Sequence, residues 1–213
     1  MRRFAHILLT ITILSGLLLA CEPETSDDAI PQDPTPEQPT PEEPEPEPEP
    51  EEPQFPENPI STLDGDTEVV FSADNSLSYA DCFGNYYHTD SYMWGLYFQN
   101  YTSKEQIYVE IMHPDYIYEI PLGNHIASDN IYSTGVLLKG GFDEDGYQAY
   151  SWYTRLKTET QPAATAPIFA GSITIEEVGE ELYKVVFDLI DDRGNKITGS
   201  YEGRMVLEDF RIN

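Results

Sequence analysis

The stretch Leu182-Tyr183-Lys184-Val185-Val186-Phe187-Asp188-Leu189-Ile190 decides the fold class of this chain. Successive side chains of a β-strand point to opposite faces of the sheet, so residues two apart share a face. Lys184 and Asp188 lie on one face, whereas the opposite face is wholly apolar and consists of Tyr183, Val185, Phe187 and Leu189. This pattern predicts a strand that packs its second face into a protein core.

The same two-residue period recurs along the chain. In residues 171–176, Ile173 and Ile175 alternate with Ser172 and Thr174. Runs rich in Tyr, Phe, Val and Ile predict further strands at residues 68–73, 77–82, 92–99, 107–112, 131–139, 147–156 and 196–206. Turns rich in Gly and Asp separate them, at residues 140–141, 143–146, 178–180 and 191–195. No segment offers ten residues of helical periodicity with caps.

These patterns predict one all-β domain over residues 60–213. A segment of this length buries most of its apolar surface in a single core. Short strands with frequent turns are typical of an antiparallel β-sandwich, which we expect here, with a lipocalin-like β-barrel as the alternative.

The N-terminus carries the pattern of an export signal. Arg2 and Arg3 precede an apolar segment, and Leu18-Leu19-Ala20-Cys21 ends it. Leu18, Ala20 and Cys21 resemble the lipobox of a bacterial lipoprotein signal peptide, although Leu19 stands where a small residue is more usual. The resemblance implies that residues 1–20 are a signal peptide, cleaved between Ala20 and Cys21, and that Cys21 carries the lipid.

Two other interpretations of this segment are open. The first is that residues 4–20 form a transmembrane anchor. They are barely long enough for this, since a spanning helix needs about 20 apolar residues. An ordinary secretion signal would leave Cys21 as an unmodified residue. A multiply acylated Cys21 would hold the protein stably in a membrane, because two or three acyl chains bind far more firmly than one.

Residues 21–59 predict a disordered stalk. Residues 22–59 contain 14 acidic residues, 13 prolines and no Lys or Arg. Such a segment has almost no apolar side chains to bury, and its like charges repel each other. The Glu-Pro repeat favours polyproline II, so the stalk would reach on the order of 100 Å at about 3.1 Å per residue.

Two further resemblances concern the cellular location. Ser26-Asp27-Asp28 resembles the acidic tether of Bacteroidetes-type surface lipoproteins, which implies the outer face of the outer membrane, with a periplasm-facing position as the alternative. The strands within residues 171–203 resemble a segment of Bacteroidetes-type β-rich lipoproteins of uncharacterised function. That second resemblance implies a fold and a location, and it brings no catalytic residue.

The net charge of the whole chain is −28. Residues 60–213 hold 25 acidic and nine basic residues, a net charge near −16. Nucleic-acid binding needs clusters of Lys and Arg opposite the phosphates, so the composition argues against a nucleic-acid partner.

Two aromatic clusters are candidate ligand sites. Tyr86 and Tyr87 lie near Trp94, and Trp152 lies among Tyr147, Tyr150 and Tyr153. Aromatic rings beside carboxylates and amides suit sugar binding, because the apolar face of a sugar ring stacks on them. The alternative is packing, since Tyr and Trp favour strands. Within this hypothesis, the candidate ligand-binding residues are Tyr86, Tyr87, Trp94 and Trp152.

Metal and catalytic patterns are weak, and we assign no metal site, cofactor or catalytic residue. His88, His113 and His125 are too scattered for a zinc ligand set. The acidic turns at Asp143, Asp145 and residues 188–195 lack the spacing of a calcium loop and match Asx turns equally well. Cys82 has no partner after lipidation of Cys21, so it is expected to be a buried small apolar residue.

The sequence therefore predicts a non-enzymatic, lipid-anchored surface protein whose β-domain binds an extracellular glycan or protein. A structural or accessory subunit of the outer-membrane surface, which pairs its sheet edges with another chain, is the alternative. A hydrolase is the third possibility.

Overall fold

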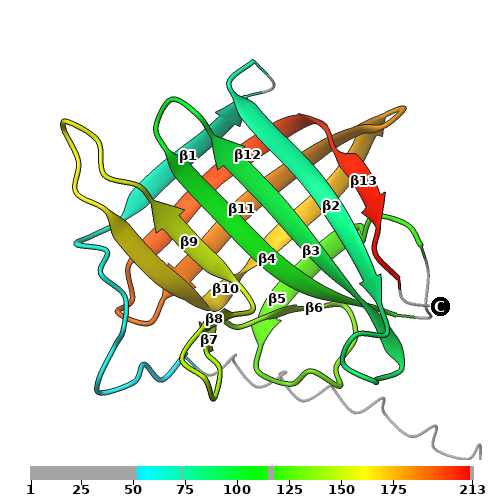
Figure 1. The fold of residues 1–213 in the computed structure, drawn as a ribbon, viewed down its shortest axis with the longest axis horizontal. Helices are drawn as coiled ribbons and strands as arrows, with labels where there is room; N and C mark the ends of the chain where they lie inside the picture. Colours follow the sequence, from blue (N-terminus) through cyan, green and yellow to red (C-terminus); the bar gives the residue numbers. More distant parts are fainter. Residues whose placement is uncertain (1–51, 73, 115–117, 212–213) are drawn as a thin grey trace, which may run out of the picture. The chain divides into compact units, whose positions relative to one another are not determined.

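The computed structural model describes residues 52–72, 74–114 and 118–211, all within one compact unit, Pro50–Asn213 (Figure 1). These residues form strands and turns, and none of them is helical. The strands are β1 (Thr67–Ser72), β2 (Ser76–Gly84), β3 (Ser91–Asn100), β4 (Glu105–Pro114), β5 (Gly123–Ser128), β6 (Val136–Leu138), β7 (Gly141–Phe142), β8 (Gln148–Ala149), β9 (Trp152–Arg155), β10 (Ala164–Gly179), β11 (Leu182–Asp191), β12 (Lys196–Arg204) and β13 (Val206–Asp209).

Eleven strands belong to one hydrogen-bonded sheet that closes on itself. The long strand β10 pairs with β9 and with β5, and β4 pairs with β9 and with β6, which itself pairs with β5. These five strands form a closed barrel. Strands β11, β12 and β1 extend it from β10, whereas β3, β2 and β13 extend it from β4.

The extensions create two layers around the core. In Figure 1, β2, β3 and β4 lie in front and cross β10, β11 and β12 behind them. The predicted all-β class is confirmed. The finer assignment to a sandwich is not, because the two layers are joined by continuous hydrogen bonds through β9 and through β5 and β6. Among the described residues, no helix is long and apolar enough to span a membrane.

Several strand boundaries differ from the sequence-based expectation. The run predicted at residues 131–139 contributes only the three residues of β6, and the run at 147–156 is divided between β8 and β9. Tyr150 has a positive φ of 64°, which interrupts the extended backbone at that division. Strands β5, β7 and β13 were not predicted, because they are short or lack a clear alternation.

The barrel interior is filled by the apolar faces of the strands. Val185, Phe187 and Leu189 of β11 are fully buried, as the alternation in this strand predicts. The Phe187 ring lies 5.0 Å from that of Phe98 on β3, in an edge-to-face arrangement that links the two layers. Cys82 is also buried in this core, as expected.

One glycine lets the long strand lie close to its neighbour. Gly171 has a φ of 91°, and a Cβ atom at this position would lie 2.1 Å from the carbonyl oxygen of Asp188 on β11. Only a residue without a side chain allows the backbones of β10 and β11 to approach this closely. On its other edge, β10 pairs with β9 before this point and with β5 after it.

The segment before β1 is fastened to the turn between β11 and β12. The buried carboxylate of Asp192 accepts hydrogen bonds from the backbone amides of Ile60 and Ser61 at 2.6 and 3.1 Å. The Asp191 carboxylate accepts one from the Ser61 hydroxyl at 2.6 Å. Phe55, within the predicted stalk, lies 5.7 Å from the ring of Phe169. The predicted signal peptide and most of the predicted stalk, with Ala20 and Cys21, lie outside the described residues.

Candidate functional site

The structure separates the four aromatic residues that the sequence singled out. Trp94 is fully buried on the core face of β3, and its ring stacks on Tyr118 at 5.6 Å. Trp152 is also buried, and its indole N–H donates to the carbonyl oxygen of Ala149 at 2.8 Å. Tyr86 and Tyr87, by contrast, lie together in the loop between β2 and β3, with ring centroids 5.0 Å apart. Only this pair contributes to an open cleft.

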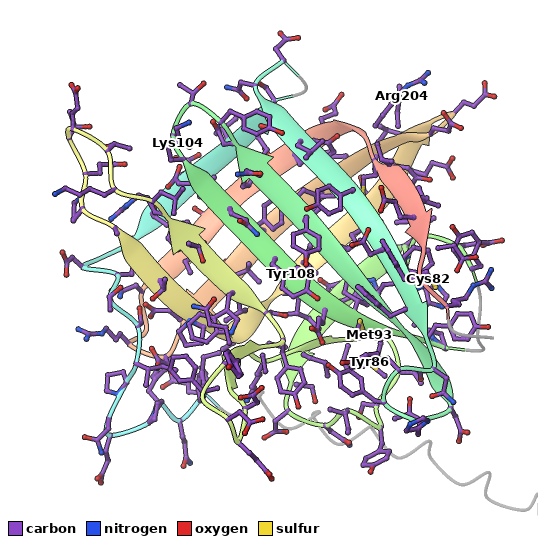
Figure 2. The ribbon with its side chains drawn as sticks, viewed as in Figure 1. Cys82, Tyr86, Met93, Lys104, Tyr108 and Arg204 are labelled. Atoms are coloured by element: carbon purple, nitrogen blue, oxygen red, sulfur yellow. The ribbon has the colours of Figure 1, made fainter. Side chains whose placement is uncertain are left out.

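The cleft lies on the outer face of β3 and β4, where the β2–β3 loop and the β7–β8 hairpin border it. Figure 2 labels three of its residues, Tyr86 in the loop, Met93 on β3 and Tyr108 on β4. The cavity has a volume of about 370 Å³. We call it the tyrosine cleft, and its lining is mainly aromatic with three polar side chains: Phe83, Tyr86, Tyr87, Met93, Tyr108, Glu110, Asp143, Gln148, Ala149 and Tyr150.

Strand alternation explains why these side chains meet on the outside of the barrel. Met93 and Gly95 on β3 and Tyr108 and Glu110 on β4 all point away from the core, because Trp94 and Val109 between them point inward. Gly95 leaves room for its neighbour, since a Cβ atom there would lie 3.0 Å from the Tyr108 ring. A small residue between large ones therefore lets the Tyr108 ring lie close over β3.

The floor of the tyrosine cleft is a carboxylate held in place by two phenols. The Tyr87 hydroxyl donates to Glu110 Oε2 at 2.6 Å, and the Tyr108 hydroxyl donates to Glu110 Oε1 at 2.9 Å. The backbone amide of Glu110 donates to the Ser151 hydroxyl at 3.1 Å. Glu110 is only 7% exposed. Both carboxylate oxygens thus have a fixed direction and retain lone pairs for further donors.

Burial and hydrogen bonding act on this carboxyl group in opposite directions. Burial raises the pKa of Glu110, and the hydrogen bonds from Tyr87 and Tyr108 counteract part of that rise. Burial, followed by the nearby Glu110 charge, also raises the pKa of both phenols. Tyr87 and Tyr108 are therefore protonated donors at neutral pH.

A row of tyrosines with their rings in contact leads away from the cleft across the sheet. Tyr108 on β4 lies 4.4 Å from Tyr97 on β3, which lies 4.6 Å from Tyr79 on β2. The three residues occupy directly opposite positions of neighbouring strands. Aromatic pairs at such positions stabilise a sheet. The row also extends the aromatic surface beyond the cleft itself.

The surroundings of the cleft are negatively charged. Asp81 on β2 is paired with Gly95, which separates it from Glu110 on β4. Burial, followed by the charge of Glu208 on β13, raises the pKa of Asp81 to about 6. The carboxyl is therefore mostly ionised at neutral pH. Asp81 and Glu110 lie on the same face with only β3 between them, and their two carboxylates disfavour an anionic ligand there.

Two of the residues weighed as metal ligands, His125 and Asp143, make hydrogen bonds within the fold. His125 places its two ring nitrogens 3.0 and 3.2 Å from the carbonyl oxygens of Gly135 and Pro121. Asp143 accepts hydrogen bonds from the backbone amides of Asp145 and Tyr147, which is an Asx turn. Within residues 52–72, 74–114 and 118–211, no three His, Cys, Asp or Glu side chains gather as a ligand set.

Of the predicted ligand-binding residues, Tyr86 and Tyr87 border this cleft, and nothing in the sequence grouped them with Glu110 and Tyr108. Tyr86 and Tyr87 were found because they are adjacent aromatics in a loop. Glu110 and Tyr108 were not singled out, although their two-residue spacing in a predicted strand places them on one face. Tyr150 was named in the second aromatic cluster, but its position beside Tyr87 could not be predicted, because it depends on the positive φ that follows β8.

The tyrosine cleft has the three features of a binding site for a polar ligand with an apolar face. It combines an open aromatic wall, a fixed carboxylate and an amide from Gln148. Comparison with known proteins adds no assignment: no family model, no curated protein and no solved structure matches this chain.

Proposed function

We propose that this chain is a lipid-anchored protein of the outer-membrane surface whose β-domain binds an extracellular glycan in the tyrosine cleft and leaves it unchanged. The single observation that carries the proposal is the exposed Tyr86 ring beside the fixed Glu110 carboxylate in one cavity. The first offers an apolar face for a sugar ring, and the second accepts hydrogen bonds from sugar hydroxyls.

The dimensions and composition of the cleft support a small carbohydrate unit. Its volume of about 370 Å³ lies within the range of small-molecule sites, about 300–1,000 Å³. Tyr86 is 57% exposed, whereas Tyr87 and Tyr150 are half-buried and hold the wall in position. A rigid aromatic wall loses little conformational entropy on binding.

The charge of the cleft narrows the glycan class. Glu110 lies on its floor and Asp81 lies one strand away, so uronic acids and sulfated sugars would bring like charges together. Neutral sugars and amino sugars with a free ammonium group avoid this repulsion. We therefore expect binding to neutral or cationic glycans.

Truncation of the exposed ring tests the glycan proposal. In glycan screening followed by calorimetric titration of the full chain, Tyr86→Ala is expected to weaken the best-binding neutral glycan about tenfold or more, because it removes the stacking surface. Tyr101→Ala is the matched control. This tyrosine is 49% exposed in the turn that ends at Lys104, at the opposite end of β4 from Tyr86 (Figure 2).

Two outcomes would contradict the proposal. One is the absence of binding to every neutral and amino glycan, and the other is an equal loss of affinity in Tyr86→Ala and Tyr101→Ala. A hydrolase is the third possibility, and the raised pKa of Glu110 is relevant to it, since a general acid needs such a shift. Chromatography of the glycan after incubation distinguishes the two, because a binding protein returns it intact.

The anchor has a separate test. Mass spectrometry of the membrane-extracted chain is expected to find Cys21 as an acylated N-terminal residue, and protease treatment of intact cells is expected to remove residues 60–213. An unmodified Cys21 would contradict the lipid anchor. A domain protected in intact cells but cleaved after lysis would contradict surface exposure.

A further inference from the structure

A second cavity lies on the other side of the β7–β8 hairpin. Its volume is about 530 Å³. It borders Gly140 and Gly141, whereas the tyrosine cleft borders Ala149, the residue paired with Gly141. Tyr150 contributes to both cavities. The hairpin and this ring therefore form a wall between two sites of different chemistry.

The second cavity, which we call the lysine cavity, is largely apolar. Leu138 is fully buried at its base, and Ile131, Pro53 and Phe169 contribute further apolar surface. Gly141 also borders it, and no atom lies within 4 Å of the place where a Cβ atom would stand. The open volume therefore extends up to the backbone of β7.

Within the described ranges, Lys139 is the one basic residue that borders the lysine cavity. The Lys139 ammonium is 4.7 Å from the centroid of the Phe169 ring, a cation–π contact. Among the described residues, ion pairs join Arg204 to Glu181 and Arg211 to Asp209, and none includes Lys139. Asp129 borders the same cavity without forming such a pair.

The position of Lys139 is fixed by the backbone around it. Its amide donates to the carbonyl oxygen of Ser128 at 2.9 Å, and the amide of Gly140 donates to that of Ile168 at 2.8 Å. The side chain is half-buried, so its charge is less hydrated than that of a surface lysine. Because Lys139 forms no ion pair in the part of the chain that the structure describes, its half-buried ammonium is available to pair with an anion that enters the cavity.

We propose that the lysine cavity binds a small amphipathic anion, an aliphatic chain that ends in one carboxylate. The chain fills the apolar volume between Leu138 and Phe169, and the carboxylate pairs with the Lys139 ammonium. Apolar burial provides the affinity and the charge-assisted hydrogen bond selects the anionic end. The two cavities share the Tyr150 ring, but neither Lys139 nor Gly141 borders the tyrosine cleft, so substitutions at these two positions are expected to leave glycan binding unchanged.

Photolabelling of the full chain in phosphatidylcholine nanodiscs tests this proposal. The probe is decanoate with a diazirine at the end of its chain, and mass spectrometry locates the labelled residues. Labelling is expected around Leu138, Tyr150 and Phe169. Excess decanoate should suppress it, whereas the same concentration of decanol or decyltrimethylammonium should not, because neither carries the carboxylate.

Two variants and a control sharpen the result. Lys139→Met keeps the aliphatic stem over Phe169 but removes the charge, and it is expected to reduce labelling about tenfold or more. Gly141→Leu fills the open volume and is expected to abolish labelling. Lys157→Met removes an exposed lysine after β9 and should leave labelling unchanged. Thermal unfolding confirms that each variant is folded.

The proposal is overturned by labelling that is spread over the surface, by equal competition from decanol, or by labelling that neither Lys139→Met nor Gly141→Leu reduces. If Lys139→Met does not fold, the decanol comparison and Gly141→Leu still decide the outcome. Loss of labelling in Lys139→Met with unchanged glycan affinity would show that the two cavities act separately.

Discussion

Replacement of Asp191 by alanine is expected to lower the free energy of unfolding by about 3–5 kcal/mol, because it removes the acceptor for four buried or half-buried donors. Its Oδ1 accepts hydrogen bonds from the backbone amides of Arg193 and Asn195 at 2.9 and 2.8 Å. Its Oδ2 accepts one from the Ser61 hydroxyl at 2.6 Å and one from the Asn195 side-chain amide at 2.9 Å. The Asp191 side chain is fully buried.

The magnitude follows from what alanine leaves behind. Each buried donor that loses its acceptor costs about 1–3 kcal/mol, and water entering the turn recovers part of the total. The substitution also removes the hydrogen bond between the Ser61 hydroxyl and the β11–β12 turn, so residues 52–63 should become more sensitive to protease than the strands. Asp192 retains only the backbone amides of Ile60 and Ser61.

Urea unfolding measured by tryptophan fluorescence provides the test, since Trp94 and Trp152 are both buried and report on the core. Asp188→Ala is the matched control, an exposed aspartate on the same strand, and it should change stability by no more than about 0.5 kcal/mol. If Asp191→Ala lowers the free energy of unfolding by less than about 1 kcal/mol, the hydrogen bonds of this carboxylate do not hold the segment before β1 in place.

The sequence predicted those features of the fold that depend on local pattern. Alternation in residues 182–190 identified Val185, Phe187 and Leu189 as core, because side-chain direction in a strand depends only on the two-residue period. The closure of the barrel could not be predicted in this way. It requires β4 to pair with both β9 and β6, and such pairing depends on contacts between distant segments that leave no periodic signal.

The candidate site shows the same division. Tyr86 and Tyr87 were recognised because an aromatic pair in a loop is visible in the sequence itself. Glu110 was hidden among many carboxylates, and only the three-dimensional structure places two phenol hydroxyls on its oxygens. The role of Asp191 as a buried hydrogen-bond acceptor could not be predicted either. A turn rich in aspartate is equally consistent with an Asx turn, a calcium loop or a buried acceptor.

The sequence allowed two roles for Trp94, ligand binding and core packing, and a substitution can now distinguish them. The run at residues 92–99 alternates, so Trp94 shares a face with Leu96 and Phe98, and both are buried. Its aromatic character suggested ligand binding, whereas its position in the strand suggested packing. Trp94 is paired with Cys82 on β2 and with Ile111 on β4, and both of these residues are fully buried.

Trp94→Ala is therefore expected to destabilise the domain by about 3–5 kcal/mol, because it leaves a large cavity that the two-layered core cannot close. Trp94→Phe should cost less, since the smaller ring keeps part of the packing and removes an indole N–H that has no acceptor among the described residues. Urea unfolding gives both values. The molecules that remain folded should bind glycan as tightly as the unmodified chain, in contrast to Tyr86→Ala, which should fold normally and bind weakly. A stable Trp94→Ala domain that has lost its glycan would reverse these roles and move the binding site from the loop to the β3 core face.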